Sequence, residues 1–227
     1  MLGDALSYPR NSSDWIPTIL IGGLLSVLSV LVLPVFVVQG YSLRVMRSAA
    51  KGEEAAPSFT DWGGLVVDGL KLFLVSLVYG LLVFVPMALV GVVLGFGSAL
   101  LSDPTTGPSA AFGVATLLGF AVVGLFGLLV GYFAPAGYAN FAVEDSLGAA
   151  FDVSTIVAAA TTGEYFKAWV LAIVVGVVLG TVGAALSVVL VGIFVIFYAQ
   201  VVTYYLFGRG FAEGLGKKRR GVVESDY

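Results

Sequence analysis

The feature that most constrains this chain is an uncharged stretch near its C-terminal end. Between Phe166 and Phe207 the only charged side chain is Lys167, at the second position. A helix needs about 20 apolar residues to cross a hydrocarbon core about 30 Å thick, and this stretch is roughly twice that length. It is therefore either one overlong membrane helix or two crossings folded back on each other.

Length favours two crossings. One helix over this stretch would be about 60 Å long at about 1.5 Å per residue, which exceeds what ordinary tilt accommodates. We therefore predict a helical hairpin with crossings at 167–186 and 188–207. The reversal is expected near Gly183–Val189, where glycine and Ser187 permit a tight turn although no charge marks it. A deep re-entrant hairpin that stops short of the far membrane surface would satisfy the same pattern.

The rest of the chain has the same character, since only 11% of its 227 residues are charged, whereas soluble domains average about 25%. The sequence predicts an all-α polytopic transmembrane bundle of about five crossings. We expect one transmembrane domain over 1–210, a charged cytoplasmic tail over 211–227 and a short interfacial helix near 146–160. The expected crossings before the hairpin are 16–38, 72–101 and 110–134.

The first crossing is expected to continue as one helix through Arg47, with a kink near Pro34. Proline removes one backbone hydrogen bond inside a helix and bends it.

The chain contains neither cysteine nor histidine. Disulfides, thiolate metal sites and cysteine nucleophiles are thereby excluded, as are the commonest general base and the commonest metal ligand. The predicted hydrocarbon segments also lack the charged residues that mark ion and proton pathways in transporters and pumps. We expect no catalytic, cofactor-binding or metal-binding residue, no cofactor and no enzymatic activity.

Three basic residues follow the first predicted crossing. Arg44, Arg47 and Lys51 have i, i+3, i+7 spacing and would share one face of a helix. They are candidates for contact with anionic lipid headgroups or a phosphate-bearing ligand. The alternative is that they only anchor the cytoplasmic end of the helix.

Three carboxylates are predicted at the membrane boundary. Asp61 precedes Trp62 at the expected start of a helix, where an acid interacts favourably with the helix dipole. Asp68 and Lys71 have i, i+3 spacing, which favours an ion pair between them, whereas Asp152 has no evident partner. Cation binding or proton acceptance is the alternative for all three aspartates.

Two amides lie in otherwise apolar segments. Asn140 and Gln200 are expected to face the interior of the bundle, because an amide that faces lipid leaves hydrogen-bonding groups unsatisfied.

The distribution of basic residues predicts the topology. Lysine and arginine are present in 39–71 and again from Arg209 to the end of the chain, whereas 102–109 contains none. Because basic residues are enriched in cytoplasmic loops, we expect 102–109 outside the cell, the N-terminus outside and the C-terminus inside.

Five short motifs lie along most of the chain: Gly40-Tyr41-Ser42-Leu43-Arg44-Val45, Phe59-Thr60-Asp61-Trp62-Gly63, Asp68-Gly69-Leu70-Lys71, Ala150-Phe151-Asp152 and Tyr205-Leu206-Phe207-Gly208-Arg209-Gly210. As a set they resemble a polytopic membrane family of halophilic archaea catalogued as a domain of unknown function, family 4013. The resemblance implies an integral membrane protein of an archaeal cell envelope with no assigned activity, and it supplies no catalytic residue.

The sequence as a whole favours a non-enzymatic membrane protein with an envelope, accessory or scaffold role. A passive channel or facilitator for a small solute is the alternative. The expected partners are membrane lipids and either a protein partner or a second copy of the chain, and no nucleic acid.

Overall fold

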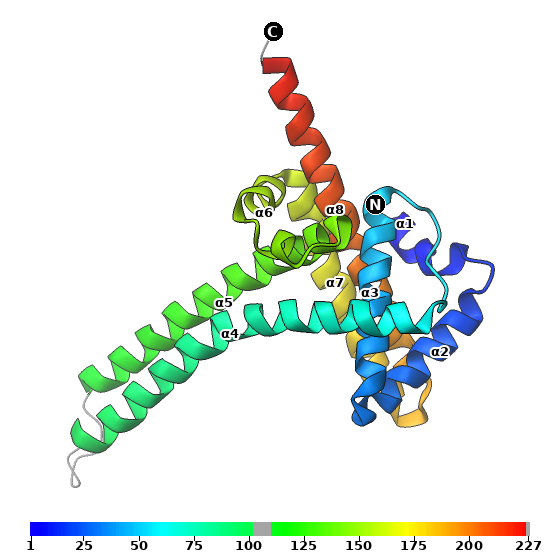
Figure 1. The fold of residues 1–227 in the computed structure, drawn as a ribbon. Helices are drawn as coiled ribbons and strands as arrows, with labels where there is room; N and C mark the ends of the chain where they lie inside the picture. Colours follow the sequence, from blue (N-terminus) through cyan, green and yellow to red (C-terminus); the bar gives the residue numbers. More distant parts are fainter. Residues whose placement is uncertain (102–109, 226–227) are drawn as a thin grey trace. The chain divides into compact units, whose positions relative to one another are not determined.

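The computed structural model describes the backbone of residues 1–101 and 110–225 and the side chains of residues 1–97 and 112–216. Every regular element in these ranges is helical (Figure 1), as the all-α prediction requires. Helices satisfy their backbone hydrogen bonds internally, which is a requirement for any segment surrounded by lipid. The connection at 102–109 that was predicted to lie outside the cell falls outside the described residues.

The chain forms two compact units. We call Met1–Val75 together with Pro135–Tyr227 the core unit, and Ser76–Ala134 the hairpin unit.

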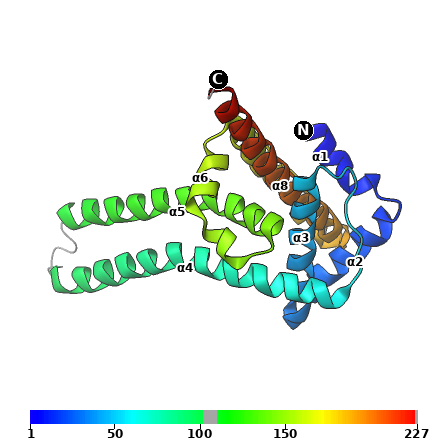
Figure 2. The same ribbon diagram turned by 45° about the horizontal axis from the view of Figure 1, so that its top comes forward.

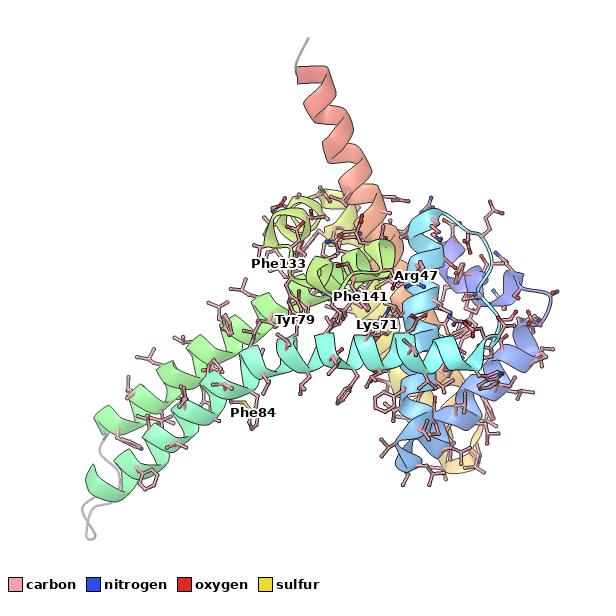
Figure 3. All side chains as sticks on the ribbon, viewed as in Figure 1. Arg47, Lys71, Tyr79, Phe84, Phe133 and Phe141 are labelled. Atoms are coloured by element: carbon pink, nitrogen blue, oxygen red, sulfur yellow. The ribbon has the colours of Figure 1, made fainter. Side chains whose placement is uncertain are left out.

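Two long helices supply the hairpin unit. They are α4 (Trp62–Leu101) and α5 (Ala110–Glu144), which extend beyond the predicted crossings at 72–101 and 110–134. Within the unit the two helices run side by side in both views (Figures 1 and 2), and a Cβ added at Gly119 would lie 3.2 Å from Cγ1 of Val90. Apolar side chains cover the outside of the pair, as the sticks around Phe84 illustrate (Figure 3).

The predicted reversal in the C-terminal stretch is confirmed. Helix α7 (Gly163–Leu186) is followed by the short turn η4 (Ser187–Val189) and by α8 (Val191–Ser225). The two helices touch near this turn, since a Cβ added at Gly192 would lie 1.9 Å from the carbonyl oxygen of Gly183. Only glycine permits so close an approach.

Helix α8 extends beyond the predicted crossing at 188–207. Its backbone continues to Ser225, so most of the expected tail is helical.

The expected first crossing at 16–38 is not one helix. The chain forms α2 (Trp15–Val27), the 3₁₀ turn η2 (Leu28–Leu31) and then α3 (Leu33–Lys51). It reverses at Val32, whose φ of 65° lies in the left-handed region, and α3 returns toward the side from which α2 came (Figures 1 and 2).

Pro34 produces no kink within a longer helix, contrary to the prediction. It lies in the first turn of α3, where a missing N–H costs no intrahelical bond and the fixed φ suits helix initiation.

Among the described residues, four helices are long and apolar enough to cross a membrane: Trp62–Gly97, Phe112–Glu144, Gly163–Val189 and Val191–Gly216. A fifth candidate is a bent pair, Leu2–Asn11 with Trp15–Leu31, whose halves meet at 93°. The predicted crossing at 16–38 is therefore not one of the four continuous candidates.

The expected interfacial helix at 146–160 is two short helices, η3 (Leu147–Phe151) and α6 (Val153–Ala160), which meet at Asp152. Leu147 and Phe151 are exposed, in keeping with contact with a membrane surface. Ile156 on α6, by contrast, is buried within the protein.

Aromatic side chains fill the centre of the core unit, where α3 and α8 pack together. Tyr41 on α3 stacks on Phe59 with ring centroids 4.2 Å apart, and it lies 5.6 Å from Phe197 on α8. All three side chains are buried. This packing fixes α3, which bears Arg44, Arg47 and Lys51.

Candidate functional site

The candidate site lies in the core unit, where the first turns of α4 cross α3. A Cβ added at Gly40 would lie 1.9 Å from the carbonyl oxygen of Leu65, and one added at Gly69 would lie 1.7 Å from that of Phe36. The two glycines therefore allow the two backbones to touch, and α4 crosses α3 at a steep angle (Figure 1). This crossing brings Asp68 to the basic face of α3.

Arg44 is held by two residues just before α4 and by one residue within it. Its guanidinium donates to the carbonyl oxygen of Thr60 at 2.7 Å and to a carboxylate oxygen of Asp61 at 3.0 Å. Its Nε lies 3.4 Å from Oδ2 of Asp68. Charge-assisted hydrogen bonds of this kind are stronger than neutral ones, and the planar guanidinium fixes their directions.

Asp61 also has the helix-terminal role that its position predicted. Its Oδ1 accepts a hydrogen bond of 3.2 Å from the backbone N–H of Gly64, in the first turn of α4. Asp61 thus joins the start of α4 to Arg44 on α3.

Arg47 and Lys71 extend the cluster to the end of α5. Arg47 donates through Nε to the carbonyl oxygen of Ala142 at 2.7 Å, and its other nitrogens lie 3.7 Å from Asp68 and 3.3 Å from Asp145. Lys71 reaches the same oxygen of Asp145 at 3.4 Å. Figure 3 labels Arg47 and Lys71 near Phe141 on α5.

The cluster is electrically balanced. Its cations are Arg44, Arg47 and Lys71, and its anions are Asp61, Asp68 and Asp145. The side chains at its centre are largely shielded from solvent, with 14% exposure for Asp68 and 17% for Arg44. An unpaired charge at such depth would cost several kcal/mol, on the order of the penalty measured for buried ions. The arrangement therefore joins α3, α4 and α5 without leaving a charge uncompensated.

The predicted basic face is present on α3, but its members differ. Arg44 and Arg47 are engaged with carboxylates. Lys51, at the end of α3, is exposed and has no ion pair among the described side chains. Lipid headgroup contact by these three residues remains a prediction.

The prediction of an ion pair between Asp68 and Lys71 was wrong. Asp68 pairs with the two arginines of α3, and Lys71 pairs with Asp145. Asp145 was not predicted to belong to the cluster. The only signal for it in the sequence is its charge just before the expected interfacial helix near 146–160.

Asp152 has hydrogen-bond partners that could not be identified from the sequence. It is the N-cap of α6, since its side chain accepts from the backbone N–H of Ser154 at 3.1 Å and from the Thr155 hydroxyl at 2.6 Å. The Thr155 hydroxyl is the main reason that the pKa of Asp152 lies below its usual value. These contacts assign Asp152 a structural role.

Asn140 is 3% exposed and donates from Nδ2 to the carbonyl oxygen of Ala149 at 2.8 Å, which ties α5 to η3. A cavity of about 530 Å³ lies beside it, lined by residues that include Glu144, Asp152 and Phe211. Because Asp152 is occupied in capping α6, the cavity does not present two free carboxylates to a ligand.

Gln200 joins α8 to α3. Its Nε2 donates to the Ser42 hydroxyl at 2.8 Å, and that hydroxyl donates in turn to the carbonyl oxygen of Val38 at 3.0 Å. Gln200 and Asn140 therefore bind different partners and do not form a common polar site.

No group of three or more histidine, cysteine, aspartate or glutamate side chains that could hold a metal ion is found within the described residues. In the cluster itself, the acidic and basic side chains of three helices neutralise one another.

Comparison with known proteins yields one family. The family model described as "Protein of unknown function (DUF4013)" matches residues 24–188, a range that includes the whole ion-pair cluster. No curated protein and no solved structure matches the chain.

Proposed function

This chain belongs to the family described as proteins of unknown function, DUF4013, and we propose that it is a non-enzymatic integral membrane protein with a scaffold or accessory role in the cell envelope. The long apolar helices support the membrane location, since helices of this length and composition suit a hydrocarbon core. An archaeal, halophilic source remains a prediction from the motifs.

The observation that supports the proposal most strongly is that the positive and negative charges of the ion-pair cluster neutralise one another. Catalytic acids, bases and nucleophiles depend on titratable groups that are poised to react with a substrate. Asp68 instead pairs with Arg44 and Arg47, and Arg47 also bonds to Ala142, so these contacts fix three helices. A rigid junction of helices is what a scaffold requires in order to hold its surfaces in place.

The surface available to a partner is the apolar exterior of the hairpin unit. Phe96 and Leu117 are about as exposed as any side chains there. In a membrane such a surface contacts lipid or a second transmembrane protein, and transmembrane helices associate through packing rather than through hydrophobicity alone.

Photocrosslinking in the native membrane tests the scaffold role. With p-benzoylphenylalanine placed at Phe96 or Leu117, we expect a discrete protein adduct on irradiation. The same label at Leu65, which is fully buried, is the matched control and should give none. If Phe96 and Leu117 yield only lipid adducts, the scaffold role is wrong.

Solute flux tests the channel alternative. Proteoliposomes that contain the purified chain should swell no faster than protein-free liposomes in a series of small neutral solutes. Flux above that baseline would replace the scaffold proposal by a facilitator.

A further inference from the structure

The uncharged parts of helices α2 and α3 are each shorter than the hydrocarbon core of a bilayer is thick. Helix α2 has 13 residues, which span about 20 Å at about 1.5 Å per residue. In α3, the distance from Leu33 to the first charged residue, Arg44, is about 17 Å by the same measure. A hydrocarbon core is about 30 Å thick, so both arms of this hairpin stop well short of the far surface if they enter it from one side.

Both ends of the hairpin are attached to each other. Before α2, Asn11 donates from its side chain to the carbonyl oxygen of Glu54 at 2.8 Å, and Ala56 donates from its backbone to the carbonyl oxygen of Tyr8 at 3.3 Å. Glu54 and Ala56 lie in the loop that follows α3. The chain therefore leaves this hairpin at the place where it entered.

That place is polar. A cavity of about 380 Å³ there is lined by Asp4, Ser7 and Asn11 from the N-terminal segment, by Glu53 and Glu54 from the loop after α3, and by Arg209 from α8. Charged groups of this density require water or headgroups around them. One polar, hydrated surface of the core unit is therefore formed by three parts of the chain. These are the N-terminal segment, the loop after α3 and the turn of α8 that contains Arg209.

The tip of the hairpin has the opposite character. No residue between Trp15 and Leu43 is charged, and the tip exposes four consecutive apolar side chains, Val30, Leu31, Val32 and Leu33, with Val30 89% exposed. Water-exposed reversals favour Gly, Asn, Asp and Pro. An apolar tip of this kind is favourable only where the surroundings are apolar.

We infer that α2–η2–α3 is a re-entrant hairpin that enters and leaves the bilayer on the cytoplasmic face, with residues 30–33 in contact with lipid acyl chains. The N-terminus then lies on the same side as the 52–60 loop, in place of the outside location expected from the sequence. Four full-length spans follow, so the N- and C-termini both lie inside, in agreement with the basic residues of 39–71 and of the tail. This inference rests on the proposed membrane location.

Cysteine labelling tests whether the two ends share a side, because the chain contains no cysteine. Gly3→Cys and Glu54→Cys place single thiols at exposed positions on either side of the hairpin. We expect a membrane-impermeant maleimide to leave both unlabelled in intact cells and to label both after the membrane is opened. Labelling of Gly3→Cys but not Glu54→Cys in intact cells would overturn the re-entrant path. Labelling of both in intact cells would keep that path but overturn the cytoplasmic face.

Quenching by brominated lipids tests the depth of the tip. With Trp15, Trp62 and Trp169 changed to Phe, Val30→Trp is a single fluorophore at the tip, and Glu54→Trp is its control. Lipids brominated on their acyl chains should quench the tip tryptophan several-fold more than the control. Equal quenching of the two would show that the tip does not enter the hydrocarbon.

A second readout guards against misfolding of the tryptophan-free chain. Val30→Cys in the otherwise unchanged chain, bearing a nitroxide, should be more accessible to oxygen than to a water-soluble nickel complex, and greater accessibility to nickel would overturn the inference. If the chain fails to float with liposomes at all, the membrane location itself is wrong. That result is distinct from a chain that floats but has a tip in water.

Discussion

Removal of the charge of Asp68 should destabilise the core unit more than removal of any exposed carboxylate. Asp68→Asn keeps the size of the side chain but leaves Arg44 and Arg47, 3.4 and 3.7 Å away, without their shared anion. Breaking a buried ion pair by removing one partner costs about 3–5 kcal/mol. We expect about 3 kcal/mol, at the low end of that range, because Arg44 keeps Thr60 and Asp61 and Arg47 keeps Ala142 and Asp145.

The assay is reversible unfolding in mixed micelles, followed by far-UV circular dichroism as the fraction of denaturing detergent rises. Glu213→Gln is the matched control, because it breaks the half-exposed pair with Arg209 on α8, and such i, i+4 pairs contribute about 0.3–0.5 kcal/mol. A second step removes the excess charge, since Asp68→Asn combined with Arg44→Gln should recover part of the loss. If Asp68→Asn costs no more free energy than Glu213→Gln, the cluster does not hold the helices together.

Three further predictions follow from particular contacts. Gly69→Ala should prevent the close crossing of α3 and α4 and lower the melting temperature in detergent, whereas Gly80→Ala, where an added Cβ meets nothing within 4 Å, should not. Gln200→Leu should lower the free energy of unfolding by about 0.6–2 kcal/mol, the range for an interhelical hydrogen bond in membranes; a neutral effect would mean that its bond to Ser42 is not stabilising. Because Asp152 has a lowered pKa, its stabilising effect is present above its unfolded pKa and is lost as pH falls through its folded pKa. Asp152→Asn should therefore stay folded at neutral pH and be less sensitive to acid, and an unchanged acid profile would contradict the capping role.

The C-terminal hairpin was predictable from the sequence. The length of an uncharged stretch sets how often it can cross a bilayer, and length and charge are properties of the chain alone. The turn η4 lies within the range 183–189, where the reversal was predicted. The all-α class follows for the same reason, because lipid leaves the backbone few other ways to satisfy its hydrogen bonds.

The first hairpin, formed by α2 and α3, could not be predicted from length and charge. Residues 16–38 have the length and composition of an ordinary crossing, and a valine at the break is a poor local signal for a left-handed residue. The reversal at Val32 is accompanied by distant contacts. Asn11 binds Glu54, and α2 packs its glycines against aromatic side chains of α8, with Phe197 beside Gly22.

The partners within the ion-pair cluster were likewise decided by tertiary structure. The sequence shows that Arg44, Arg47 and Asp68 are charged and roughly where they lie along their helices. It places Asp68 nearest to Lys71, because spacing along the sequence identifies only neighbours on the same helix. The crossing at Gly40 and Gly69 instead turns Asp68 toward the arginines, and Asp145 joins them from 98 residues away along the chain from Arg47. Ion pairs form between charges that are close in space, and that proximity exists only once the helices have packed.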